Sequence, residues 1–355
     1  MKYYILISIL TLCGIASAEN VFCLTSSSHV KMFASAFRSD FLERSNKLAL
    51  NDSNVKNIYS FSAKNDSDLV FKIEESFKQG CQVLVGLYTS KECLLGAPIA
   101  QKYNRVILSP TCSHDDLMKW KGFVFTMVPS IDEYINETLQ YIEKNKKIKK
   151  LIVIYQPSDV FSNSSFESFN RKNKNKYLFV RLNKEGDFYS EDLPSLENFE
   201  FDSVLILTYP VVGIKAVASL SATVKNKRLI TLISSSSWAF DQSVLKTNSR
   251  VFDKFRYLII PEVAPIDVYR QSIFFKNYQK QYNESPFGIH AMSYDATRMA
   301  LKCYKTYGIN FKAESFRRCI IGKSYLGLTG KYNFSVDSPF IKRKIYFEDS
   351  KGKLQ

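Results

Sequence analysis

The residues best suited to holding a ligand lie in two hydroxyl-rich turns, Tyr-Thr-Ser at 88–90 and Thr-Cys-Ser at 111–113. Hydroxyl groups beside the free backbone N–H groups of a helix N-terminus can bind an anion such as a carboxylate. The same residue types also cap helices when no ligand is involved. The two turns therefore predict either an anion site or ordinary helix caps.

A β-α-β unit positions these turns. Residues 83–85 form a short apolar strand, residues 91–102 carry apolar side chains at helical spacing, and residues 105–108 form a second strand. A right-handed crossover places both turns at the carboxyl ends of neighbouring parallel strands. Ligands bind at that edge in open α/β sheets, so the unit predicts a binding site there.

Strands and helices alternate along the rest of the chain, and no repeat of 20 to 50 residues recurs. This alternation predicts two parallel sheets, each covered by helices. The first helix is expected at residues 30–45. Two alternating runs near the end, residues 331–334 and 342–347, are predicted to pair as a hairpin. With 355 residues, the chain exceeds one comfortable core and is expected to form two lobes.

The first residues predict export. Residues 3–12 are apolar but too short to span a bilayer, and Ala-Ser-Ala at 16–18 predicts cleavage before Glu19. No later segment is long and apolar enough to cross a membrane, so we expect an exported, soluble chain. The net charge is +15. Its basic patches, at 144–150 and 171–176, lack interleaved aromatic residues, which favours a solvated surface over nucleic-acid binding.

Cysteine usage agrees with an exported chain. Of the seven cysteines, Cys13 lies in the leader, and the six that remain can form disulfides. Cys303 with Cys319 is the first candidate pair, and Cys93 with Cys112 is the second, although spacing alone leaves the connectivity open. No C-x-x-C or paired Cys/His spacing indicates zinc.

Motifs for catalysis are missing from the sequence. It contains no G-x-S-x-G elbow, no P-loop and no dinucleotide fingerprint, and its three histidines are scattered. His114-Asp115-Asp116 could hold a metal or act as a base, but these aspartates are expected to cap a helix at Leu117. We therefore expect no enzyme activity, no cofactor and no metal site.

Several motifs, in the same order and spacing, resemble type I periplasmic solute-binding proteins, the class that includes the Leu/Ile/Val-binding proteins of amino-acid ABC transporters. They are the G-x-x-x-S turn at 86–90, APIA at 97–100, ILSPTCS at 107–113, KLIVIY at 150–155, SPFGIHAMSYDATRMALKCY at 285–304 and GLTGKYNF at 327–334. The resemblance implies an α/β fold of two lobes, each a mainly parallel sheet flanked by helices, with a ligand cleft between them. Residues 19–130 with 266–335 would form the N-terminal lobe, and residues 131–265 with 336–355 the C-terminal lobe.

The resemblance also assigns ligand-binding roles. In this family the first lobe holds an amino acid's carboxylate, and those positions fall on Ser90, Thr111 and Ser113. In the second lobe, Phe161 and Tyr209 would cover the ligand or bind an ammonium group by cation–π attraction. Ser236 stands where amino-acid binders often place an acidic residue as counter-ion to the ammonium.

The resemblance implies a monomeric periplasmic protein that captures an amino acid or a related organic acid for the membrane permease of an ABC-type importer. Because Ser236 replaces the usual acidic residue, a carboxylate ligand without an ammonium also fits. A sensory, regulatory or cell-envelope interaction protein with a degenerate cleft is the alternative.

Overall fold

The computed structural model describes residues 21–27, 41–51, 58–173, 177–223, 230–240, 248–252 and 255–349. The predicted signal peptide, residues 1–18, lies outside these ranges, as does most of the predicted first helix. The helix observed there, α1 (Phe41–Leu50), ends five residues later than predicted.

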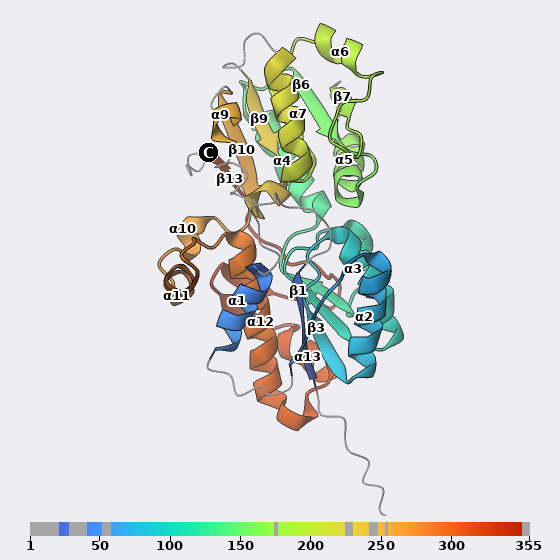
Figure 1. Ribbon diagram of the computed structural model, residues 1–355, viewed down its shortest axis with the longest axis vertical. Coiled ribbons are helices and arrows are strands. Elements are labelled where there is room, and N and C mark those ends of the chain that lie inside the picture. The colour runs from blue at the N-terminus through green and yellow to red at the C-terminus, as the bar shows by residue number, and fades with distance from the viewer. Residues whose placement is uncertain are drawn as a thin grey trace, which may run out of the picture.

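The first lobe, the lower one in Figure 1, is built on a parallel five-stranded sheet. Its strand order is β2-β1-β3-β4-β5. Its strands are β1 (Val21–Ser27), β2 (Ile58–Ser62), β3 (Cys81–Val85), β4 (Val106–Ser109) and β5 (Val124–Thr126). Helices α2 (Asp66–Lys78) and α3 (Ser90–Lys102) pack on one face, and α12 (Gly288–Tyr307) and α13 (Ala313–Ile320) pack on the other. The last two helices come from the end of the chain, so the lobe is assembled from distant segments.

The second lobe is built on a six-stranded sheet in the order β13-β10-β9-β8-β6-β7. Its strands are β6 (Leu151–Tyr155), β7 (Leu178–Arg181), β8 (Ser203–Ile206), β9 (Thr231–Ser234), β10 (Tyr257–Glu262) and β13 (Tyr346–Asp349). All neighbours are parallel except β13, which pairs antiparallel with β10. Helices α4 (Ile131–Lys144) and α5 (Val160–Lys172) cover one face, and α6 (Leu193–Asn198), α7 (Pro210–Thr223) and α9 (Ser249–Phe252) cover the other.

The predicted terminal hairpin is wrong. Strand β12 (Gly330–Asn333) pairs instead with β11 (Ser324–Gly327) across a tight turn, and β13 joins the second lobe. An alternating run predicts a strand but does not specify its partner, and here β12 pairs with the preceding strand, β11.

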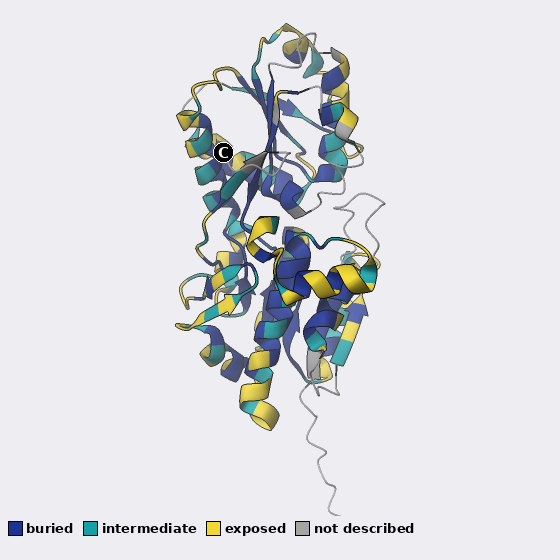
Figure 2. Cartoon of the chain, turned by 90° about the vertical axis from the view of Figure 1, so that its left-hand side faces the viewer, coloured by how far each residue is buried: buried dark blue, intermediate teal, exposed yellow. Residues whose placement is uncertain are grey.

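The chain crosses from one lobe to the other three times, at residues 127–130, 263–265 and 334–345. Short helices complete the fold: α10 (Ile266–Tyr269), α11 (Ile273–Tyr282), and the 3-10 helices η1 (Asp115–Trp120), η3 (Ser236–Phe240) and η4 (Gly308–Asn310). The inner strands of both sheets are buried, whereas the edge strand β2 and the outer helix faces are partly exposed (Figure 2). Within the described ranges, no helix has the length and apolar character that crossing a membrane requires.

Three disulfides join elements of the first lobe. They are Cys303–Cys319, Cys93–Cys112 and Cys23–Cys81. The first joins α12 to α13 and the second joins α3 to the turn after β4, which confirms both predicted pairs. The third joins the neighbouring strands β1 and β3 and was not predicted.

Candidate functional site

A small cavity of about 20 Å³ lies between the two lobes. All six residues predicted from the sequence to contact a ligand line it: Ser90, Thr111, Ser113, Phe161, Tyr209 and Ser236. Tyr88, Val128, Tyr134 and Ser237 complete the lining. A space of this size holds about one water molecule, so the lobes are closed and a larger ligand enters only when they separate.

The N-terminus of α3 is already occupied by an acidic side chain of its own turn. Thr89 Oγ1 accepts a hydrogen bond from Glu92 N at 3.1 Å, and the Glu92 carboxylate accepts from Tyr88 N at 2.9 Å and Thr89 N at 3.0 Å. This is a capping box, and Glu92 is buried. An anion in the cleft therefore cannot use these two N–H groups, whereas the hydroxyl of Ser90 lines the cavity beside them.

The two hydroxyl-rich turns form one unit. Thr111 Oγ1 donates to Tyr88 O at 2.7 Å, and Ser109 Oγ donates to Leu87 O at 2.6 Å. The Cys93–Cys112 disulfide joins the same segments covalently. Because its hydrogen is donated to Tyr88 O, the Thr111 hydroxyl positions the turns and can offer a ligand only its lone pairs.

Five hydroxyl groups around the cavity have no hydrogen-bond partner among the described residues. They are those of Ser90, Ser113 and Ser236 and the buried Oη atoms of Tyr88 and Tyr134. Burial raises the pKa of Tyr134, so its hydroxyl keeps its proton and remains a donor. Tyr134 was not predicted to contact a ligand, because it lies on the apolar face of α4, where an aromatic residue is typical of a core position.

Two aromatic rings form the second-lobe wall. Phe161 and Tyr209 stack with centroids 5.1 Å apart and planes 27° apart. Phe161 lies in the first turn of α5, whose N-terminus is capped by Asp159 accepting from Ser162 N at 2.7 Å. Burial raises the pKa of Tyr209 well above its usual value, with smaller contributions from the negative charges of Asp159 and Glu92, so the ring presents a neutral phenol.

The serine turn after β9 is held by a single carbonyl. Ser235 Oγ, Ser237 Oγ and Trp238 Nε1 all donate to Thr208 O, at 2.8, 3.2 and 2.9 Å. These bonds fix the turn and leave Ser236 facing the cavity with no side-chain partner in the described part of the chain. In the described part of the chain, no charged side chain lines the cavity, so a buried ammonium group would find no carboxylate there.

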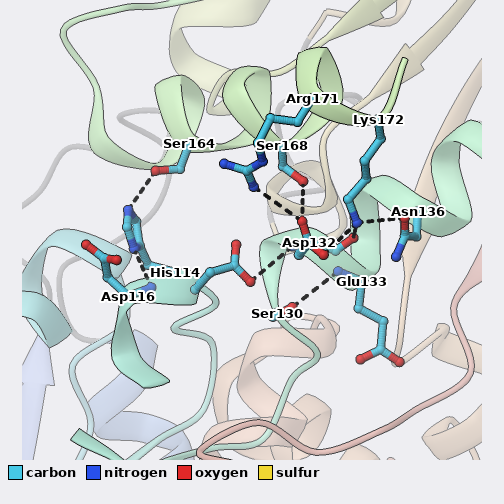
Figure 3. Close-up of polar contacts among 11 residues, drawn as sticks. His114, Asp116, Ser130, Asp132, Glu133, Asn136, Ser164, Ser168, Arg171 and Lys172 are labelled. Carbon is cyan, nitrogen blue, oxygen red and sulfur yellow. Dashed lines mark hydrogen bonds and ion pairs between the residues drawn. The ribbon is translucent and has the colours of Figure 1, made fainter. Parts of the chain in front are cut away.

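The cavity is flanked by polar contacts between the lobes (Figure 3). His114 Nδ1 accepts from Asp116 N at 3.1 Å, and His114 Nε2 lies 2.6 Å from Ser164 Oγ of α5. Asp115 Oδ1 accepts from Asp132 N at 3.4 Å, in the first turn of α4. The expectation that the aspartates cap the helix at Leu117 is therefore corrected: the side chain of His114 caps η1.

A larger groove of about 990 Å³ opens beside the chain crossings, between Asp115, Glu133, Lys172 and Lys342. None of the six predicted residues lines it. Over the described ranges, no group of three or more His, Cys, Asp or Glu side chains is arranged to hold a metal ion.

Comparison with known proteins agrees with this geometry. Residues 72–347 match the family described as periplasmic binding protein. The chain belongs to this family. No curated protein sequence matches the chain.

Solved structures share the architecture of this periplasmic binding protein. A branched-chain amino acid transporter substrate-binding protein, LivJ, from Streptococcus pneumoniae in complex with isoleucine, has a TM-score of 0.78 at 15% identity over 95% of this chain and 98% of its own. A leucine-binding protein, LivK, from Thermotoga maritima has a TM-score of 0.78 at 13% identity over 94% and 97%. At these identities the likeness establishes the shared two-lobed fold.

A third similar structure is a solute-binding protein of an ABC transporter from Rhodopseudomonas palustris in complex with 3,4-dihydroxybenzoic acid. It has a TM-score of 0.75 at 14% identity over 93% of each chain. The fold of this chain is therefore shared by proteins solved in complex with different acids.

Proposed function

We propose that this chain is an exported solute-binding protein that captures a small carboxylate-bearing ligand between its lobes and delivers it to the permease of an ABC-type importer. The observation that carries the proposal is that hydroxyl and aromatic side chains from both lobes line one closed cavity. The family and the ligands named for similar structures, isoleucine and 3,4-dihydroxybenzoic acid, support it.

In this proposal the hydroxyls of Ser90 and Ser113 donate to the carboxylate, and Thr111 holds their two turns together. A carboxylate accepts hydrogen bonds only, so these donors suit it. Phe161 and Tyr209 close over the ligand from the second lobe. Tyr134 and Ser236 would hydrogen-bond a polar group at the ligand's other end.

The identity of that other group separates two ligand classes. An amino acid would place its ammonium against Phe161 and Tyr209 by cation–π attraction. A hydroxy or oxo acid would instead accept a hydrogen bond from Tyr134 Oη, a buried donor that has no partner among the described residues. The proposal covers both classes, and a matched set of ligands distinguishes them.

Thermal unfolding with leucine, 2-hydroxy-4-methylpentanoate, 4-methyl-2-oxopentanoate, benzoate and 3,4-dihydroxybenzoate tests the proposal. A ligand at 100 times its Kd adds about 2.7 kcal/mol of stability, which raises the midpoint measurably. The three C6 acids share one side chain and differ at the second carbon. The order of their midpoint shifts therefore shows which group the other end of the cleft accepts. If no carboxylate shifts the midpoint at millimolar concentration, the capture of a carboxylate is wrong.

A second candidate function is a sensory, regulatory or cell-envelope interaction role with a cleft that no longer captures solutes. The small cavity volume, about 20 Å³, favours this alternative. This alternative predicts that none of the acids above raises the unfolding midpoint. It also predicts that substitutions at Ser90 or Phe161 leave the sensory, regulatory or interaction role unchanged.

A further inference from the structure

A contact between two side chains joins the lobes beside the cleft. His114, in the first lobe, lies next to Ser113, and its Nε2 is 2.6 Å from Ser164 Oγ on α5 (Figure 3). The same helix carries Phe161, which faces Ser113 across the cavity. If the turn that carries Ser113 and His114 separated from α5, the cleft would open and this contact would break at the same time.

The hydrogen bonds of His114 determine its tautomer. Nδ1 accepts from Asp116 N at 3.1 Å, so it carries no proton. The neutral ring therefore carries its proton on Nε2 and donates it to Ser164 Oγ. Protonation would add a hydrogen to Nδ1, so that Nδ1–H and the backbone N–H of Asp116, two donors, would face each other. The ring would have to turn, which breaks both the cap of η1 and the bond between the lobes.

We infer that the His114–Ser164 contact holds the lobes closed near neutral pH and is released when the imidazole is protonated in mild acid. The inference concerns closure of the proposed binding cleft and so rests on the proposed function, although closure can be measured without a ligand.

The charges around His114 set the pH range. Burial lowers its pKa below the usual value of 6.5, and Lys119 on the same turn acts in the same direction. Asp116 and Asp115 on that turn, and Glu167 on α5, oppose this effect. The contact is therefore complete above pH 6.5 and is lost as the pH falls through the lowered pKa.

A second inter-lobe contact does not depend on the imidazole. Asp115 Oδ1 accepts from Asp132 N near the chain crossing, and burial raises the pKa of Asp115. Protonation of Asp115 at lower pH would add a separate change in the separation of the lobes, and this change persists in a variant without His114. The two effects can therefore be told apart.

Small-angle scattering of the full chain without added ligand, from pH 8 to pH 5, tests the inference. His114→Asn keeps a side-chain oxygen that can cap η1 but does not titrate, and Ser164→Ala removes the partner from a helix that tolerates alanine. We expect the wild-type chain to expand in acid. Both variants should be expanded already at pH 8 and should show only the separate change due to Asp115 at lower pH. Loss of one net hydrogen bond corresponds to about a fivefold shift from closed to open.

The inference is overturned if the wild-type chain keeps one size across this range, or if either variant is as compact as wild type at pH 8. Calorimetric titration with leucine and with 4-methyl-2-oxopentanoate provides the binding measurement. Where one of them binds, its Kd should rise about fivefold in the variants at pH 8. If neither binds, the proposed ligand class is in question while the scattering result still decides whether His114 controls closure.

Discussion

The Cys93–Cys112 disulfide offers a way to separate the stability of the fold from the preorganisation of its cleft. It joins α3, which begins at Ser90, to the residue before Ser113, and it closes a loop with a sequence separation of 19. In the chain-entropy description a loop of this length contributes about 3 kcal/mol to stability. Replacing both cysteines by alanine should lower the free energy of unfolding by about that amount.

Cys303–Cys319 provides a matched control. Its sequence separation of 16 predicts nearly the same loss, also about 3 kcal/mol, but it joins α12 to α13 and none of its residues lines the cleft cavity. Denaturant unfolding should therefore rank the two double-alanine variants as equals. Calorimetric titration with an acid that binds the wild-type chain should show an affinity loss of about fivefold only for the Cys93 and Cys112 variant, because its two turns are no longer fixed to each other.

Two results would refute this reasoning. Equal loss of affinity in both variants would mean that binding follows global stability. Unchanged affinity in the Cys93 and Cys112 variant would mean that the hydrogen bonds between the turns suffice without the disulfide.

Three further predictions concern single residues. Tyr134→Phe and Tyr278→Phe should each raise the free energy of unfolding by about 1 kcal/mol, because each removes a buried hydroxyl that has no partner among the described residues. Only Tyr134→Phe should also weaken binding of a hydroxy or oxo acid in calorimetry. Asp295→Asn should cost about 3 kcal/mol in denaturant unfolding, because the buried carboxylate accepts four hydrogen bonds that hold the β11–β12 turn; a loss below about 1 kcal/mol would contradict this role. Gly86→Ala should lower the thermal midpoint markedly, since Gly86 has φ of +134° and an added Cβ would lie 1.7 Å from Thr25 Oγ1; an unchanged midpoint would show that the site relaxes without cost.

The sequence indicated the two-lobed fold because its strands and helices alternate with clear boundaries. The hydroxyl-rich turns could be located because each follows a buried apolar strand, and the adjacency of parallel strands brings Ser90 and Ser113 together. Their roles toward a ligand remain predictions. The disulfide between β1 and β3 was not predicted, because the two strands are neighbours in the sheet but are separated by β2 in the sequence.

Other features depended on partners that local patterns do not reveal. Glu92 follows Thr89 at capping-box spacing, so the sequence held a signal that the helix N-terminus would be occupied. Tyr134 gave no such signal, because hydrophobic periodicity does not show whether a ring faces a core or a cavity. The inter-lobe contact of His114 joins residues 50 positions apart and depends on how the two lobes meet.

A crystal structure of the chain with the most stabilising carboxylic acid would show where the ligand binds. We expect the acid's carboxylate within hydrogen-bond distance of Ser90 Oγ and Ser113 Oγ, with Phe161 and Tyr209 closed over the rest of the molecule. An acid bound in the larger groove beside Asp115 and Lys342, with the cleft still closed on its small cavity, would contradict it.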